Sequence, residues 1–523
     1  MKNKTIKLLA SALFSTFLLS NLANSNMVHA SSHHELHEAV TKIAGKKNYP
    51  IYRNITNNGP IGKFTNTKNF KYNHLESKKF TKTKQGTYWL LIVNGRAIGW
   101  VNQNFFARNA LATADHVSLV KNPYGKFNTK DAINYATTKT GTLKDSASVK
   151  VSTKHIKATK AGKHVVTFYN GQTTRKLIVN VRKDADEGIM HANIKPTASY
   201  QDTTSWSGRS KGSSQMWNAI HHYGIENSKD NYKSSTDDMT LTTRLYQPRF
   251  LSLDYHMNDK LSQIGVTPEG ITINHGLMAI SLYSNPHSLH GHLATYNLNN
   301  LTNPYDVQKL VSMPWSKFVQ YSHNIKVSPY LKLGHGQAIS MTKDYIYVLA
   351  NNNKLKNSAN SEEIFQIRRK DLTIKRIWTI KTWNNDANAP RYFHNAVFTN
   401  DHTMYGLFHN ATKGRYEYWR LTRHGNTWTP KEIGATDTNF VTNAPVQGFT
   451  YDANDDKFYI GFNDRLFGVN PAGQVTNNYK FDTKRELEGL SVDRGVLYAE
   501  LAQRSELLQT NISKSEISKL MLN

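Results

Sequence analysis

Short runs in which apolar and polar residues alternate recur along most of the chain. The runs Ser148–Ser152 and Lys176–Val181 alternate with a period of two, which is typical of half-buried β-strands. The dipeptides Asn94-Gly95 and Asn170-Gly171 separate neighbouring runs, as the tight turns of β-hairpins do. Beyond residue 30, no apolar run approaches the ~20 residues that cross a bilayer as a helix. The pattern predicts a mainly β protein.

A repeated unit fills the second half of the chain. Each unit holds a polar residue, a small residue, a short strand, a turn and a strand that carries Tyr. Units begin at residues 337, 395, 447 and 488, with a degenerate one at 263, so the intervals are 74, 58, 52 and 41 residues. Propeller blades repeat every ~40–50 residues. We therefore expect a β-propeller over residues 244–523, with five blades; four or six are the alternatives.

The small residue of each unit has a physical reason in such a fold. The innermost strands of a propeller crowd around a channel, where a bulky side chain would clash. The polar residues in front of the small ones would then ring one mouth of the channel: Gln337, Asn395, Gln447 and Glu488, with His335 and His394 beside them. Amides and histidines suit the binding of a neutral glycan or another surface ligand. The alternative is that they only join the inner strands.

Two shorter β-rich regions precede the propeller. Residues 49–108 have the length and strand pattern of a small barrel. Residues 109–184 have the looser pattern of a β-sandwich, and the polar residues 185–243 read as a linker. The literal G-x-S-x-G at Gly208–Gly212 has neither the buried strand nor the helix start that a nucleophile elbow needs.

The N-terminal residues have the features of a secretory leader. A basic start is followed by the apolar stretch Leu8–Leu22 and by Val28-His29-Ala30, which has the form of a signal-peptidase site. We expect residues 1–30 to be a signal peptide and residues 31–48 a flexible N-terminus; a retained anchor is the alternative. The protein would then be secreted, and it would stay on a cell by non-covalent contacts.

Positive charge is concentrated in the N-terminal third. Residues 1–184 hold 25 Lys and 5 Arg against 7 acids, whereas residues 185–523 hold 36 basic residues against 31 acids, out of a net charge of +28. Outside a cell, such a region meets teichoic acids, acidic polysaccharides or anionic lipid head groups, and export argues against nucleic acid. The alternative is that surface proteins of this kind are basic throughout, which predicts no asymmetry. The absence of Cys excludes disulfides, thiolate metal sites and a cysteine nucleophile.

Residues 49–108, the first of the two shorter β-rich regions, resemble the bacterial SH3-like GW modules. The resemblance rests on Tyr88-Trp89, the Asn94-Gly95 turn and Ile98-Gly99-Trp100-Val101. It implies attachment to the cell wall, because GW modules bind lipoteichoic acid and other wall polyanions through basic faces. The candidate wall-binding residues surround the same hairpin: Lys78, Lys79, Lys82, Lys84, Arg96 and Trp100. A single copy implies weak, salt-sensitive retention.

The other two regions also resemble known families. Ala161–Phe168 and Val179–Val181 are similar to bacterial immunoglobulin-like spacer domains. His335–Ala338, Pro445–Phe449 and Leu487–Leu490 are similar to helveticin J-type bacteriocins, over about residues 245–510. That resemblance implies a propeller, secretion by lactobacilli, and binding to or killing of related bacteria.

The leading function is that of a non-catalytic adhesion protein of the cell surface, which needs no cofactor and no metal. A helveticin-like bacteriocin is the main alternative and a propeller-type glycan hydrolase the second. Inverting hydrolysis needs two carboxylates ~6.5–9.5 Å apart. Glu488 is the one acid among the expected ring residues, and a second acid would have to come from Asp254, Asp386 or Glu269.

Overall fold

The structure is a computed structural model of the 523-residue chain. It describes residues 34–38, 48–70, 75–93, 96–106, 109–121, 125–139, 143–183, 196–197, 228–247, 267–283, 289–307, 313–322, 324–350, 361–381, 393, 395–410, 413–437, 441, 445–483, 485–502 and 505–510. Within these ranges nearly all regular structure is β, and no helix is long and apolar enough to cross a membrane.

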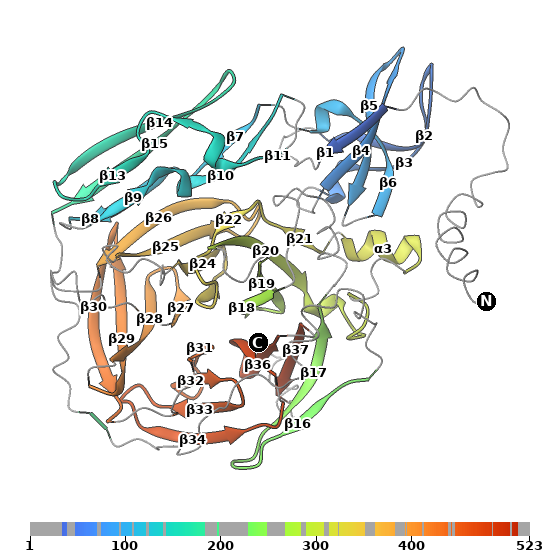
Figure 1. Cartoon of the computed structure of the whole chain (residues 1–523). Coiled ribbons are helices and arrows are strands. Elements are labelled where there is room, and N and C mark those ends of the chain that lie inside the picture. Colours follow the sequence, from blue (N-terminus) through green and yellow to red (C-terminus); the bar gives the residue numbers. More distant parts are fainter. Residues whose placement is uncertain are drawn as a thin grey trace, which may run out of the picture.

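Five sets of antiparallel strands form the blades of a propeller (Figure 1). The first blade contains β18 (Thr267–Asn274), β19 (Leu277–Tyr283), β20 (His290–Asn297) and β21 (Lys326–Val327), with β22 (Leu331–Lys332) also on β20. The second contains β23 (Ile339–Met341), β24 (Tyr345–Ala350), β25 (Ser361–Arg368) and β26 (Ile374–Lys381). The third contains β27 (Asn395–Asn400), β28 (Thr403–Asn410), β29 (Arg415–His424) and β30 (Thr427–Ala435). The fourth contains β31 (Gly448–Asp452), β32 (Lys457–Phe462), β33 (Arg465–Val469) and β34 (Val475–Lys480).

The fifth blade joins two distant parts of the chain. It contains β35 (Leu487–Asp493), β36 (Val496–Leu501) and β37 (Glu506–Thr510), followed by β17 (Thr240–Tyr246) and β16 (Asn231–Lys233). The innermost strands β18, β23, β27, β31 and β35 contact one another in this order, and β35 contacts β18, so the ring is closed. The expectation of a mainly β fold with a five-bladed propeller is confirmed.

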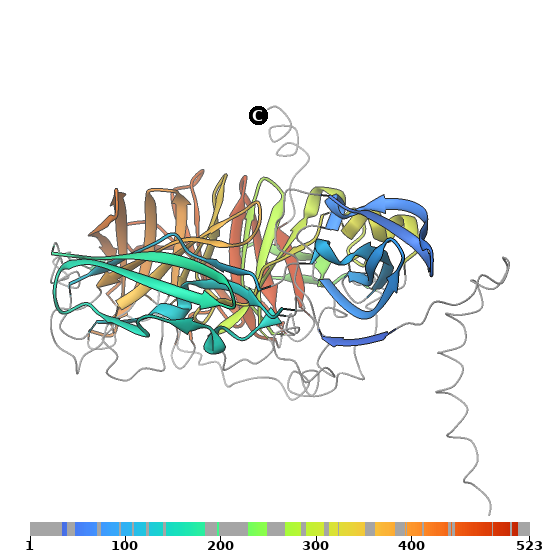
Figure 2. The same cartoon turned by 90° about the horizontal axis from the view of Figure 1, so that it is seen from above.

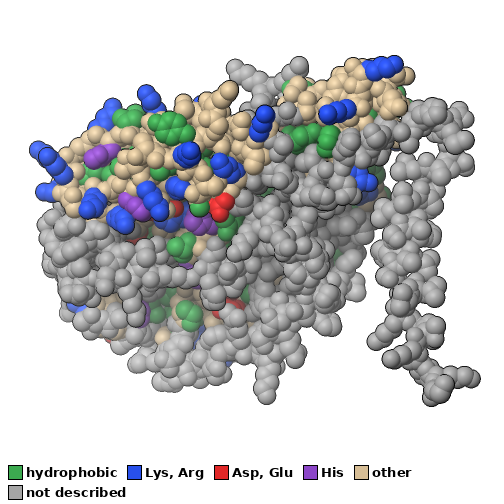
Figure 3. All heavy atoms as spheres, turned by 45° about the horizontal axis from the view of Figure 1, so that its top comes forward, with side chains coloured by type: hydrophobic (Ala, Val, Ile, Leu, Met, Phe, Trp, Pro, Cys, Tyr) green, Lys and Arg blue, Asp and Glu red, His purple; other side chains and the backbone are tan. Residues whose placement is uncertain are grey.

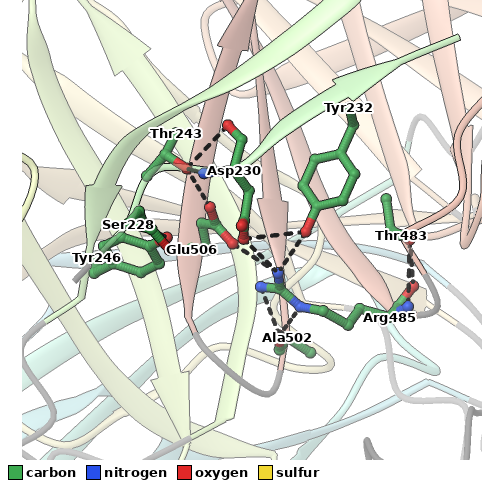
Figure 4. A network of polar contacts seen from close by, with 9 residues as sticks. All are labelled: Ser228, Asp230, Tyr232, Thr243, Tyr246, Thr483, Arg485, Ala502 and Glu506. Carbon is green, nitrogen blue, oxygen red and sulfur yellow. Dashed lines mark hydrogen bonds and ion pairs between the residues drawn. The ribbon is translucent and has the colours of Figure 1, made fainter. Parts of the chain in front are cut away.

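A network of polar side chains holds the closing strands (Figure 4). The Arg485 guanidinium lies 2.6 Å from the Glu506 carboxylate and donates a hydrogen bond of 3.2 Å to the Tyr232 hydroxyl. The Thr243 hydroxyl donates to the other oxygen of Glu506 at 2.5 Å. Residues 231–243, which we expected to belong to the linker, therefore contribute β16 and the start of β17 to the propeller. Tyr232 and Thr243 contact Arg485 and Glu506, which lie more than 240 residues later in the chain. No local sequence pattern therefore predicts this pairing.

The first N-terminal region is one six-stranded sheet. Its strands are β1 (His34–Glu38), β2 (Pro50–Thr56), β3 (Gly59–Asn66), β4 (Leu75–Thr83), β5 (Gly86–Val93) and β6 (Arg96–Asn102), in the order β1-β4-β5-β6-β2-β3. The hairpin expected around Asn94-Gly95 is formed by β5 and β6. Over the described residues β1 and β3 are free edges, so the pairing does not close into a barrel. The strand β1 lies within residues 31–48, which we expected to be a flexible N-terminus.

The second region shares a sheet with the propeller. Its strands are β7 (Leu111–Thr113), β8 (His116–Val120), β9 (Lys126–Asn128), β10 (Ile133–Thr137), β11 (Leu143–Lys144), β12 (Lys150–Val151), β13 (His155–Lys157), β14 (Gly162–Asn170) and β15 (Thr173–Arg182). The strand β8 pairs in parallel with β15 on one side and with β26 on the other. One eight-stranded sheet therefore runs from β12 to the innermost strand β23. The region expected to be a spacer is continuous with the second blade.

Side-chain packing joins the regions further. One apolar cluster contains Val117, Val179 and Ile377, which belong to the second region and to the second blade. Figures 1 and 2 show the second region along the outer edge of this blade and the first region beside the helix α3 (Trp315–Ser322). Short 3-10 helices lie at Thr67–Phe70, Gln103–Phe105, Thr129–Ala132, Ser146–Ser148 and Leu298–Asn300.

Candidate functional site

The start of each innermost strand carries a polar residue followed by Gly or Ala. These residues are Glu269, Gln337, Asn395, Gln447 and Glu488. The amide Nε2 of Gln337, in front of the second blade, donates to Oε1 of Gln447, in front of the fourth blade, at 2.5 Å. Because these two blades are not neighbours in the ring, their side chains meet across the channel. Four of the five ring residues were predicted from the repeat.

The small residues are required by close backbone approach. A Cβ added to Gly270 would lie 2.3 Å from the carbonyl oxygen of Gly336, and one added to Gly489 would lie 2.8 Å from the amide nitrogen of Ile271. A Cβ added to Gly448 would lie 2.6 Å from Cγ of Leu490. These contacts join neighbouring inner strands, as the crowding argument predicts.

The first repeat unit begins later in the chain than we expected. We expected it to begin at residue 263, which lies outside the described residues, but the inner strand β18 presents Glu269. The triplet Glu269-Gly270-Ile271 has the same form as Glu488-Gly489-Leu490. This similarity between the two triplets is the sequence signal that would have located the start of the first blade. Glu269 therefore adds a second carboxylate to the ring, on the blade next to that of Glu488.

Most ring side chains are buried rather than open to solvent. Glu269, Gln447 and Glu488 are 6%, 5% and 6% exposed, and Asn395 is fully buried. The Oδ1 atom of Asn395 accepts a hydrogen bond from the amide of Ala396, so this side chain is turned to its own backbone. Asn395 is therefore not exposed to a ligand at the mouth.

A histidine at the mouth is accessible to solvent. The side chain of His335 is 47% exposed, and its Nε2 lies 3.7 Å from Oε2 of Glu269. On the opposite side, Nε2 of Gln447 donates to Oε1 of Glu486 at 3.2 Å. His394, which we expected beside the ring, lies outside the described residues. The mouth thus offers an exposed imidazole backed by carboxylates and amides, which can donate to and accept from a polar ligand.

Further carboxyl groups are buried one or two strands outward. Glu500 on β36 pairs with Gly489, and burial raises the pKa of its carboxyl to about 8. Burial also raises the pKa of Glu362 on β25. Among the described residues, no group of three His, Asp or Glu side chains is arranged to hold a metal ion.

The second candidate site is the basic surface of the first region. Lys79, Lys82 and Lys84 are exposed on β4 and on the turn that follows it. The side chain of Lys78 lies outside the described residues. Two further exposed basic residues, Arg53 and Lys63, were missed because their strands β2 and β3 carry no recognisable motif. The exposed lysines fit the expected contact with a polyanion.

Two expected wall-binding residues point elsewhere. The Arg96 guanidinium lies over the rings of Trp315 and Phe318, at 4.9 Å and 4.7 Å, and donates to the carbonyl of Met313. It therefore joins the first region to α3 and is only half-exposed. Trp100 is 8% exposed, so its ring is interior. For these two residues the expectation of surface contact is corrected. Burial removes the Trp100 ring from water, and cation–π contacts hold the Arg96 guanidinium against α3.

Comparison with known proteins identifies part of the chain. Residues 36–107 match the family model of the GW (Gly-Tryp) dipeptide domain. No curated protein matches the chain. Among solved structures, glutaminyl cyclase of Myxococcus xanthus is similar with 11% identity and a TM-score of 0.29, over 47% of this chain and 90% of that one. The gluconolactonase XC5397 of Xanthomonas campestris is similar with 6% identity and a TM-score of 0.27, over 54% of this chain and 95% of that one. Similarities of this size carry no information about activity.

Proposed function

We propose that the protein is a secreted, non-catalytic protein of the bacterial cell surface, held non-covalently to the wall by residues 36–107. The GW match over these residues, together with the exposed Lys79, Lys82 and Lys84, carries this proposal. The partner is an anionic wall polymer, a lipoteichoic or wall teichoic acid, whose phosphates accept the ammonium groups. The propeller then presents its channel mouth to a glycan or another surface ligand.

Attachment is tested with the full mature protein and purified cell walls in a series of salt concentrations. Neutralising phosphates releases counterions, so binding should weaken steeply with salt. Removing teichoic acid from the walls should abolish most of the binding. The triple variant Lys79→Gln/Lys82→Gln/Lys84→Gln should elute at lower salt than the unchanged protein. Undiminished binding to walls that lack teichoic acid would contradict the proposal.

The mouth of the propeller is tested separately. If it binds a ligand, His335→Ala should reduce binding to whole cells and leave the midpoint of unfolding unchanged, because the side chain is exposed. Gln337→Ala instead removes the bond across the channel and should also lower stability, by about 1 kcal/mol. Unchanged cell binding by both variants would remove the mouth from the functional surface.

A glycan hydrolase is the second candidate, because Glu269 and Glu488 are two carboxyl residues on neighbouring inner strands. One acid and one base at a mouth are what inverting hydrolysis requires. The assay incubates the protein with cells of several Gram-positive species and scores binding, viability and released sugar together. Released sugar that disappears in Glu269→Gln and in Glu488→Gln would support the hydrolase. Loss of viability without released sugar would support the bacteriocin interpretation.

A further inference from the structure

The outward face of the β14–β15 hairpin combines apolar and basic side chains. Val166 and Phe168 of β14 are buried, so the alternate residues Val165, Thr167 and Tyr169 lie on the other face. Val165 and Tyr169 are 53% and 43% exposed. Exposed apolar side chains that lie together on one face are found at contact surfaces.

Strand register places basic residues around these apolar side chains. Directly paired residues of antiparallel strands share a face. Lys150 of β12 pairs with Tyr169, and Lys176 of β15 pairs with Thr167. Lys163 lies two residues before Val165 on the same face. We name the set Lys150, Lys163, Val165, Tyr169 and Lys176 the hairpin face. All three of its lysines are exposed, and Figure 3 shows Lys and Arg gathered over the second region, with apolar side chains between them.

The described acidic residues of the second region have partners other than the lysines of the hairpin face. Asp115 forms ion pairs with Arg368 and Lys375 of the second blade. Asp131 forms an ion pair with Lys332 of the propeller at 2.9 Å. Asp145 accepts a hydrogen bond from the amide of Ala147 at the start of a 3-10 helix. Over the described residues, no ion pair joins a lysine of the hairpin face to an acid. Among the described residues, no acid paired with these lysines therefore neutralises the positive charge of this face.

We propose that the hairpin face is a second binding surface for the same phosphate-bearing wall polymer that residues 36–107 bind. The inference rests on the proposed function and extends it to a region without a GW motif. Lysine ammonium groups bind phosphate as point charges and tolerate varied geometry along a flexible chain. The rings and methyl groups between them cover the carbon atoms of the polymer backbone. Three cations separated by apolar side chains match a polymer in which phosphates alternate with polyol units.

The test uses the full-length protein, purified wall teichoic acid as the probe, and a measured dissociation constant at several salt concentrations. The first variant is Lys150→Gln/Lys163→Gln/Lys176→Gln. The matched control is Lys343→Gln/Lys413→Gln/Lys431→Gln, which removes three exposed lysines of the propeller and gives the same net charge. The first variant should bind at least about tenfold more weakly near physiological salt. Its slope of log affinity against log salt should fall by about two, at ~0.7 per lost phosphate contact. The control should change binding less than about twofold, by long-range charge alone.

A further variant separates apolar contact from charge. Val165→Ser/Tyr169→Ser should weaken binding without a change in the salt slope, because no charge is removed. If the hairpin variants and the propeller control bind alike, the hairpin face is not a binding surface, and the proposed function stands. If the unchanged protein does not bind teichoic acid at all, the proposed function fails and this inference fails with it. Equal binding to a carboxylated polysaccharide without phosphate would overturn the assignment to a phosphate polymer.

Discussion

Lys332 lies where the second region meets the propeller, and its replacement tests whether they are one stable unit. Its side chain is 9% exposed on β22. The ammonium group lies 2.9 Å from Oδ2 of Asp131 in the second region and 2.5 Å from Oε2 of Glu363 in the second blade. Burial alone would lower the pKa of Lys332, but the two carboxylates outweigh it and raise the pKa overall. The lysine is therefore charged at neutral pH.

The variant Lys332→Met leaves two buried carboxylates without their cation. Breaking a buried ion pair by removing one partner costs ~3–5 kcal/mol of unfolding free energy. The variant Lys332→Met/Asp131→Asn/Glu363→Gln removes all three charges, and it should recover most of this loss because no uncompensated charge remains. Comparing the two variants separates the cost of orphaned charge from the loss of packing around the lysine stem.

The assay is urea unfolding followed by the fluorescence of the 9 Trp residues, at about pH 5 and about pH 7. Burial raises the pKa of Glu363. In Lys332→Met, the Glu363 carboxyl keeps its proton in the folded state at a pH where it loses it in the unfolded state. The free energy of unfolding of this variant therefore falls as pH rises above the usual pKa of Glu. The loss of unfolding free energy in Lys332→Met, relative to the unchanged protein, should be larger near pH 7 than near pH 5. A deficit below about 1 kcal/mol at neutral pH, or one that is the same at both, would refute this reasoning.

Three further predictions follow from single positions. In Gly489→Ala the new Cβ meets the Ile271 amide at 2.8 Å, and the variant should lose about 1–3 kcal/mol in the same unfolding assay. In Arg96→Ala the first region loses its contact with Trp315, so hydrogen exchange in both segments should become faster while that of the fourth blade stays unchanged. Because the pKa of Glu500 is about 8 in the folded protein, stability should fall as pH rises from about 5 to about 8. Glu500→Gln should remove this fall; an identical pH profile would place the titration elsewhere.

The blades were predictable because their signals are local. In the fourth blade, the polar residue, the small residue, the strand and the turn lie within residues 447–462, and Gly448 is small because Leu490 lies against it. The hairpins at residues 94–95 and 170–171 were predictable for the same reason, since both turn residues are neighbours in the chain. We placed the start of the first blade at residue 263 and not at Glu269. The 74-residue interval before the next unit is longer than a regular blade, so the spacing of the repeat does not locate the triplet that begins at Glu269.

The contacts between regions were not predictable, because their partners are distant. Arg96 looks like a surface cation within its own hairpin, and only the fold brings α3 against it. Asp131 and Lys332 are 201 residues apart, and neither stands in a motif. The parallel pairing of β8 with β26 also has no signal in the sequence. A short apolar strand is as compatible with a place inside a β-sandwich as with the outer edge of a propeller blade. Local patterns therefore locate the ring and the GW hairpin, whereas the joining of the regions depends on the tertiary fold.

The fifth blade has a consequence for the order of folding. Its outer strands come from residues 231–246 and its inner strands from residues 487–510. On a ribosome or behind a translocation channel, β17 emerges more than 250 residues before its partner β37. The ring stays open until almost the whole chain is available, and the closing step must bring together segments with a very large sequence separation. Such topologies fold slowly, because loop-closure entropy is lost before the new contacts compensate for it. Closure of the ring is therefore completed by β37, the last described strand to appear.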